Sequence, residues 1–171
     1  RRVAMVDTFS RNQPEIFGRK VSEEVQKAVE KKQLPYPNLR YSGSGEVTEN
    51  HIPGLAEVSK NGIRLWGFSR VIVIAEKLRE IGASVIISCD KTSHPSFVEE
   101  AIQKGFSLAY SSESVTDIPP TGTLVTFPVH KEGKVHEVVD SESLCPKVVS
   151  EFLYGHRQRE SCQKVCTRCH E

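Results

Sequence analysis

The chain has 171 residues, of which 37% are hydrophobic and 26% charged, and its formal net charge at pH 7 is +1. These values are typical of one soluble globular domain with a sizeable core, and they exclude a strongly basic protein whose whole surface binds nucleic acid. No apolar run approaches the roughly 18 residues of a membrane-spanning helix, so we expect no membrane partner. The five cysteines are a poor disulfide framework, which favours an intracellular location in the cytoplasm or the nucleus.

The N-terminal segment RRVAMVDTF has the apolar pattern of a buried first strand that ends at Asp7. Because this strand pattern begins at the first residue, we expect no signal peptide. Apolar residues at helical spacing then predict a helix over 19–31. The next stretch, 32–62, contains several prolines and glycines without a clear period, which predicts a long loop.

The middle of the chain has the clearest alternation of helices and strands. The segment FSRVIVIAEKLREIG predicts a helix whose apolar stripe begins at Phe68 and ends before Gly82. SVIISCD then predicts a buried strand ending at Asp90, SHPSFVEEAIQKG a second helix, and FSLAYS a further strand. This order is typical of a parallel sheet with helices packed on its faces.

The last third of the chain has a different pattern. TLVTFPV and KVHEVVD flank HKEG and predict a β-hairpin, and PKVVSEFLYG predicts a short last helix. We therefore expect an α/β domain over 1–155, a three-layer sandwich with a mainly parallel sheet and a late β-hairpin. A basic tail rich in cysteine and histidine follows over 156–171.

Two aspartates follow predicted strands, Asp7 after the first and Asp90 after a later one. Ligands of open α/β sheets bind at the carboxyl ends of the strands, so these carboxylates would meet in one crevice if the strands are neighbours. Two carboxylates suit Mg²⁺ or Mn²⁺, which can activate water against a phosphodiester. The alternative is that each aspartate caps the turn or helix after its strand. No glycine-rich phosphate loop follows the first strand, so a dinucleotide site or a P-loop is not expected.

The first strand ending in Asp7 resembles the opening of PIN-like NYN ribonucleases, the Regnase-type RNA-decay enzymes. The stretch NGIRLWGFSRVIVIAEKLREIGASVIIS also resembles their segment of loop, long helix and second strand, so the likeness extends over about residues 1–110. The resemblance implies a metal-dependent ribonuclease in which Asp7 holds the metal ion and Asn12 supports it. Glu113 or Asp117 would complete the metal shell, although the family's later acidic motifs have no clear counterpart here. A catalytically inactive relative that binds RNA or a protein partner is the alternative function.

Cys89, in ISCDK, offers a further alternative chemistry. A thiol at a strand end can act as a nucleophile, with His94 or His51 as its base. However, cysteine is among the most buried residue types, so a core position is the simpler interpretation of VIISC.

Basic and aromatic residues also occur together around the expected loop, at Arg40, Tyr41, Arg64, Trp66 and Arg70. Arginines contact phosphates and aromatic rings stack on bases, so such a cluster could hold single-stranded RNA. The alternative is a solvated basic surface with Trp66 in the core.

The C-terminal tail concentrates residues of the types that bind zinc. The predicted ligands are Cys162, Cys166, Cys169 and His170. Four such ligands would form a closed, structural site. Because His170 directly follows Cys169, Cys145 or His156 is an alternative fourth ligand. A haem attachment pattern in CTRCH, a redox C-x-x-C pair and a basic tail that contacts a partner are the other interpretations.

Overall fold

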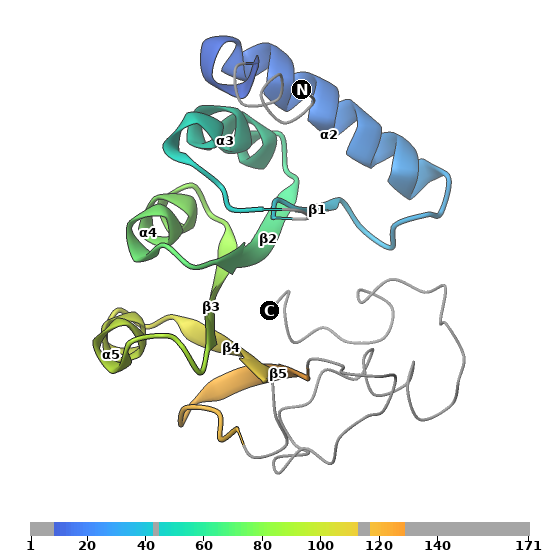
Figure 1. Ribbon diagram of the computed structural model, residues 1–171. Coiled ribbons are helices and arrows are strands. Elements are labelled where there is room, and N and C mark those ends of the chain that lie inside the picture. Colours follow the sequence, from blue (N-terminus) through green and yellow to red (C-terminus); the bar gives the residue numbers. More distant parts are fainter. Residues whose placement is uncertain (1–8, 43–44, 113–116, 129–171) are drawn as a thin grey trace. The chain divides into compact units, whose positions relative to one another are not determined.

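The computed structural model describes residues 9–42, 45–112 and 117–128 (Figure 1). In chain order, its elements are α2 (Pro14–Glu30), β1 (Asn38–Arg40), the 3-10 helix η1 (Glu49–His51), α3 (Ile52–Lys60), β2 (Arg64–Ser69), α4 (Ile72–Glu80), β3 (Ser84–Asp90), α5 (Pro95–Gln103), β4 (Ser107–Ser112) and β5 (Thr123–Pro128). The predicted first strand with Asp7, the second strand of the hairpin, the last helix and the cysteine-rich tail lie outside the described residues.

The strands form a five-stranded parallel sheet in the order β1-β2-β3-β4-β5. Parallel neighbours require a crossover connection, and α3, α4 and α5 occupy the connections between the first four strands. The predicted α/β fold with a mainly parallel sheet is therefore confirmed, and it is consistent with a three-layer sandwich. The chain consists of two compact units, Arg1–Val85 and Ile86–Glu171.

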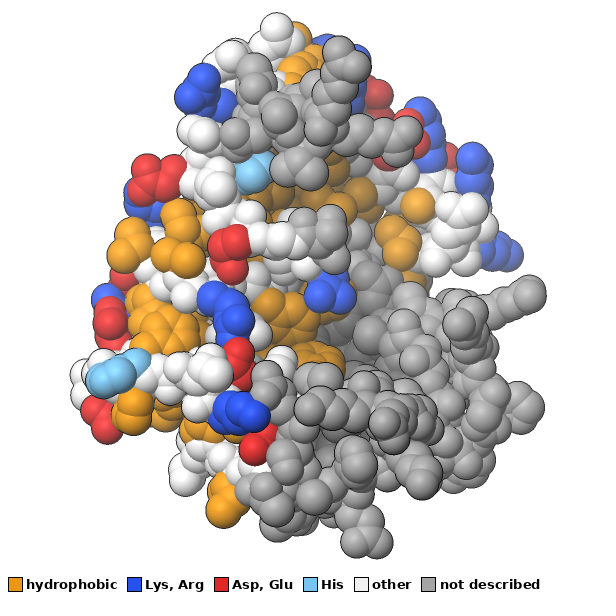
Figure 2. Space-filling model, viewed as in Figure 1, with side chains coloured by type: hydrophobic (Ala, Val, Ile, Leu, Met, Phe, Trp, Pro, Cys, Tyr) orange, Lys and Arg blue, Asp and Glu red, His pale blue; other side chains and the backbone are white. Residues whose placement is uncertain are grey.

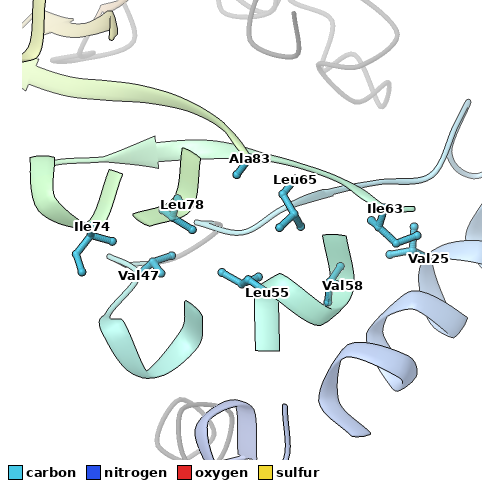
Figure 3. Close-up of a cluster of buried hydrophobic side chains, with 9 residues drawn as sticks. All are labelled: Val25, Val47, Leu55, Val58, Ile63, Leu65, Ile74, Leu78 and Ala83. Carbon is cyan, nitrogen blue, oxygen red and sulfur yellow. The ribbon is translucent and has the colours of Figure 1, made fainter. Parts of the chain in front are cut away.

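The core of the first unit lies between β2 and the helices α3 and α4 (Figure 3). Its buried side chains are Val25, Val47, Leu55, Val58, Ile63, Leu65, Ile74, Leu78 and Ala83. Full burial of one large apolar side chain of this kind stabilises a fold by about 1.5–3 kcal/mol. Successive side chains of a strand point to opposite faces, so Leu65 points toward the helices while Arg64 and Trp66 point away from them.

Helix α2 lies alongside α3 in the first unit and contacts it closely (Figure 1). The buried residues of α2 are Gly18, Ser22 and Val25, whose spacing places them on one face of the helix. The predicted helix over 19–31 is confirmed, and it begins earlier, at Pro14. Proline suits the first turn of a helix because its missing N–H has no intrahelical partner there.

Two predictions about the first unit are wrong. The expected long loop over 32–62 contains β1, η1 and α3. Pro53, which contributed to the loop prediction, lies in the first turn of α3, where proline is tolerated. Phe68 belongs to β2, and α4 begins only at Ile72. The apolar run before the helix forms a buried parallel strand, which a short run cannot distinguish from a helix by periodicity.

The second unit confirms the predicted helix and strands between residues 86 and 128. Helix α5 begins at Pro95 and ends before Gly105, whose φ of 72° is the left-handed conformation that glycine adopts without strain. The first strand of the predicted hairpin is present as β5, and it pairs in parallel with β4.

Candidate functional site

Asp90 is the last residue of β3, and its side chain shapes the turn that follows. Its Oδ1 accepts hydrogen bonds from the Thr92 backbone N–H at 2.9 Å and the Thr92 hydroxyl at 2.6 Å. The Ser93 hydroxyl donates to the same oxygen at 3.4 Å, and the Asp90 N–H donates to Ser93 Oγ at 3.0 Å. Asp90 therefore has the turn-capping role that the sequence left open as the alternative to metal binding.

Two of the predicted catalytic aspartates affect the pKa of Tyr110 in β4. Burial raises the pKa of the Tyr110 hydroxyl above its ordinary value, and the carboxylate of Asp117 raises it further. The charge of Asp90 acts in the same direction, as does Cys89 when it is a thiolate, and the charge of Lys91 acts in the opposite direction. In the parallel register, Cys89 lies opposite Tyr110 and Asp90 lies opposite Ser111, so Asp90 and Tyr110 belong to neighbouring strands at the carboxyl ends of β3 and β4.

The described residues supply only part of the predicted metal chemistry. Asp90 and Asp117 offer the oxygen ligands that Mg²⁺ and Mn²⁺ prefer. Within residues 9–42, 45–112 and 117–128, no group of three or more His, Cys, Asp or Glu side chains could hold a metal ion. Asp7 and the predicted zinc ligands Cys162, Cys166, Cys169 and His170 lie outside these ranges. Further ligands for a divalent ion would have to come from outside the described residues.

Cys89 and the two histidines considered as its bases have structural roles. Cys89 is fully buried, and its Sγ lies 3.6 Å from the carbonyl oxygen of Ala109, to which it donates. His94 caps α5, because its Nδ1 accepts the backbone N–H of Ser96 at 3.3 Å. The Nδ1 of His51 likewise accepts, at 3.1 Å, the backbone N–H of the residue that precedes η1. These positions agree with a core cysteine rather than an accessible nucleophile.

Arg40, Trp66 and Phe68 form a stacked cluster in the first unit. The guanidinium carbon of Arg40 lies 5.5 Å from the centroid of the Trp66 ring and 5.1 Å from that of Phe68. The two rings meet edge to face, with centroids 6.3 Å apart. Trp66 is only 5% exposed whereas Arg40 is exposed, so the rings support the arginine and Trp66 offers no open face to a base.

Arg64 also stacks on an aromatic ring, whereas Tyr41 packs against the core. The guanidinium carbon of Arg64 lies 5.6 Å from the centroid of the Tyr36 ring. Tyr41 packs against the core, and its hydroxyl lies 3.4 Å from the carbonyl oxygen of Ser84, to which it donates. Burial, and then the charge of Glu46, raises the pKa of Tyr41. Of the residues grouped in the sequence, Tyr41 therefore belongs to the core.

No sequence pattern marks two residues that organise these regions. The Oε1 of Glu46 accepts a hydrogen bond from the Ser69 hydroxyl at 2.6 Å, and its Oε2 accepts one from the Arg70 backbone N–H at 3.0 Å. These bonds fix the loop between β1 and η1 to the end of β2. Glu46 lies in the glycine-rich stretch SGSGE, whose composition indicates a linker. Tyr110 lies inside an apolar strand, where an aromatic residue is indistinguishable by pattern from an ordinary core residue.

On the face that Figure 2 shows, charged side chains of both signs are interspersed among the described residues, and the net charge of the chain is only +1. None of the helices in the described residues is long and apolar enough to cross a membrane.

Comparison with family models, curated proteins and solved structures finds no match to this chain. The relationship to PIN-like NYN ribonucleases therefore stays a prediction.

Proposed function

We propose that the chain is a metal-dependent ribonuclease domain whose acidic centre lies at the carboxyl ends of β3 and β4. The observation that supports this proposal is the position of Asp90 at the end of β3, beside the carboxyl end of β4 that Asp117 follows along the chain. Both carboxylates also act on the pKa of Tyr110. A divalent ion such as Mg²⁺ or Mn²⁺, when bound, would activate water and polarise the scissile phosphate. Asp7 is the further ligand that the resemblance implies.

The side chains around this centre have distinct roles in the proposal. The hydrogen bonds from Thr92 and Ser93 hold the Asp90 carboxylate in one orientation before an ion binds, which lowers the cost of binding. The ordinary pKa of tyrosine, about 10, already keeps the Tyr110 hydroxyl protonated at neutral pH, so it can donate to an anionic oxygen. Asp117 supplies the second negative charge.

The decisive test separates the charge of Asp90 from its turn-capping role. Asparagine keeps an oxygen that accepts the hydrogen bonds of the turn but removes the charge, so Asp90→Asn should fold normally. We expect cleavage of single-stranded RNA in the presence of Mn²⁺ to fall at least about 100-fold in Asp90→Asn and in Asp117→Asn. Asp90→Ala should lose the same activity and, in addition, about 1 kcal/mol of stability.

The matched control is Glu99→Gln, which removes an exposed carboxylate from α5 in the same unit. Its cleavage rate should equal that of the wild type. Wild-type protein without Mn²⁺-dependent cleavage above background would contradict the proposal, as would unchanged cleavage by both Asn variants.

A second candidate function is a catalytically inactive module that binds RNA. The observation that favours it is the commitment of Asp90 Oδ1 to three hydrogen bonds of the turn. Purified protein that binds RNA but never cleaves it with Mg²⁺ or Mn²⁺ present would decide for this candidate.

A further inference from the structure

The face of β1 and β2 that points away from α3 and α4 carries two arginines; we refer to it as the outer face. Arg40 lies opposite Trp66 in the parallel register, and Asn38 lies opposite Arg64. Residues paired in this way share a face, so Arg40 and Arg64 are diagonal neighbours on the outer face. Strand spacing and rise place their Cα atoms about 8 Å apart.

The aromatic rings fix the Arg40 side chain while its charged end stays in solvent. Its guanidinium contacts both Trp66 and Phe68, and the side chain is exposed. Within the described part of the chain, Arg40 has no ion pair with a carboxylate. An arginine held by rings loses less conformational freedom when it binds a ligand, and its planar group can make two parallel hydrogen bonds to a phosphate.

We infer that Arg40 and Arg64 on the outer face contact successive phosphates of single-stranded RNA. This inference rests on the proposed function for the class of ligand, and it assigns the contacts. The buried Trp66 leaves the arginines, rather than base stacking, to make the interaction. A phosphodiester chain carries a charge at every nucleotide, so two arginines on one face can engage it whatever its sequence.

The test is binding of a fluorescein-labelled 12-nucleotide oligouridylate, followed by fluorescence anisotropy with EDTA present to prevent cleavage. Arg40→Ala should raise the Kd about 5–10-fold and lower the slope of log Kd against log salt by about 0.7. Arg40→Lys keeps the charge but loses the planar guanidinium group, so it should bind the oligonucleotide about threefold more weakly than the wild type. Arg64→Ala should act in the same direction as Arg40→Ala.

The matched control is Arg19→Ala, which removes one exposed arginine from α2 in the same unit. Its Kd should remain within about twofold of the wild type, so that an effect of net charge alone is recognised. Circular dichroism of each variant checks the fold, and Arg40→Lys preserves the test if Arg40→Ala unfolds. Equal weakening by the control, or normal binding by both Arg40 variants, would overturn the inference. So would competition by polyglutamate as strong as that by unlabelled RNA, since the surface would then fit an acidic peptide.

The binding inference and the proposed nuclease activity can be refuted independently of each other. Arg40-dependent RNA binding without Mn²⁺-dependent cleavage would support this inference and remove the proposed nuclease activity. Cleavage that depends on Asp90, together with unchanged RNA binding by the Arg40 variants, would support the nuclease and remove this inference.

Discussion

Gly18 lies where α2 packs tightly against α3, so replacement by alanine tests the packing of the first unit. A Cβ at this position would lie 2.3 Å from the Cβ of Glu57, 3.0 Å from its carbonyl carbon and 3.1 Å from the backbone nitrogen of Val58. Ordinary contacts between carbon atoms are about 3.5–4.0 Å, so the two helices would have to separate by about 1 Å. None of the three atoms is the end of a flexible side chain that could move aside.

The magnitude follows from two opposing effects. Alanine should favour the helix by about 1 kcal/mol relative to glycine. Overpacking against backbone atoms costs about 3 kcal/mol at the upper end of its usual range. We therefore expect Gly18→Ala to lower the free energy of unfolding by about 2 kcal/mol, through a lower urea midpoint with an unchanged m-value.

The control for Gly18→Ala is Gln26→Ala, at an exposed position of the same helix. It should change the unfolding free energy by at most about 0.5 kcal/mol. A Gly18→Ala variant as stable as the wild type, or more stable, would refute the close approach of α2 and α3.

Two further predictions concern stability. Leu78→Ala removes a fully buried side chain and should cost about 2–5 kcal/mol in urea unfolding, whereas Val73→Ala on the same helix, at a position 57% exposed, should cost far less; similar losses would contradict the assigned core. The second prediction concerns the loss of folding stability at alkaline pH, which Tyr41→Phe tests. Because burial and Glu46 raise the pKa of Tyr41 in the folded state above the ordinary value of 10.0, its contribution to stability is complete below about pH 10 and is lost as the pH rises through the folded pKa. Unfolding free energies measured from pH 9 to 11 should therefore decline less steeply in Tyr41→Phe than in the wild type, and equal slopes would exclude this role.

The alternation of strands and helices could be predicted because each element between Ser84 and Ser112 has its own local pattern. SVIISCD is a largely apolar segment, interrupted only by Ser88, that ends at Asp90, and α5 is bounded by Pro95 and Gly105. The first unit was harder to predict because β1 has only three residues, which is too short for any period to appear. Proline is common both in loops and in the first turn of a helix, so Pro53 alone does not say which of the two is present. The burial of Leu55 and Val58 in the core shows that Pro53 lies in the first turn of a helix.

The candidate site was partly predictable for a related reason. Asp90 follows a recognisable strand, so its place at the carboxyl end of the sheet could be inferred, but its hydrogen bonds with Thr92 and Ser93 depend on side-chain geometry that spacing does not encode. The effect of Asp117 on the pKa of Tyr110 depends on how the chain folds beyond β4, which no local sequence pattern specifies. The support of Arg40 by Trp66 and Phe68 likewise requires the register of β1 on β2.

The brevity of β1 has a consequence for self-association. It is the outermost of the described strands at its end of the sheet, and an outermost strand presents backbone groups that can template pairing with another molecule. Here that template spans only three residues, with Pro37 directly before it and the charged Arg40 at its end. Proline cannot donate to a ladder and a charge resists stacking, so this border of the sheet is poorly suited to growing into fibrils.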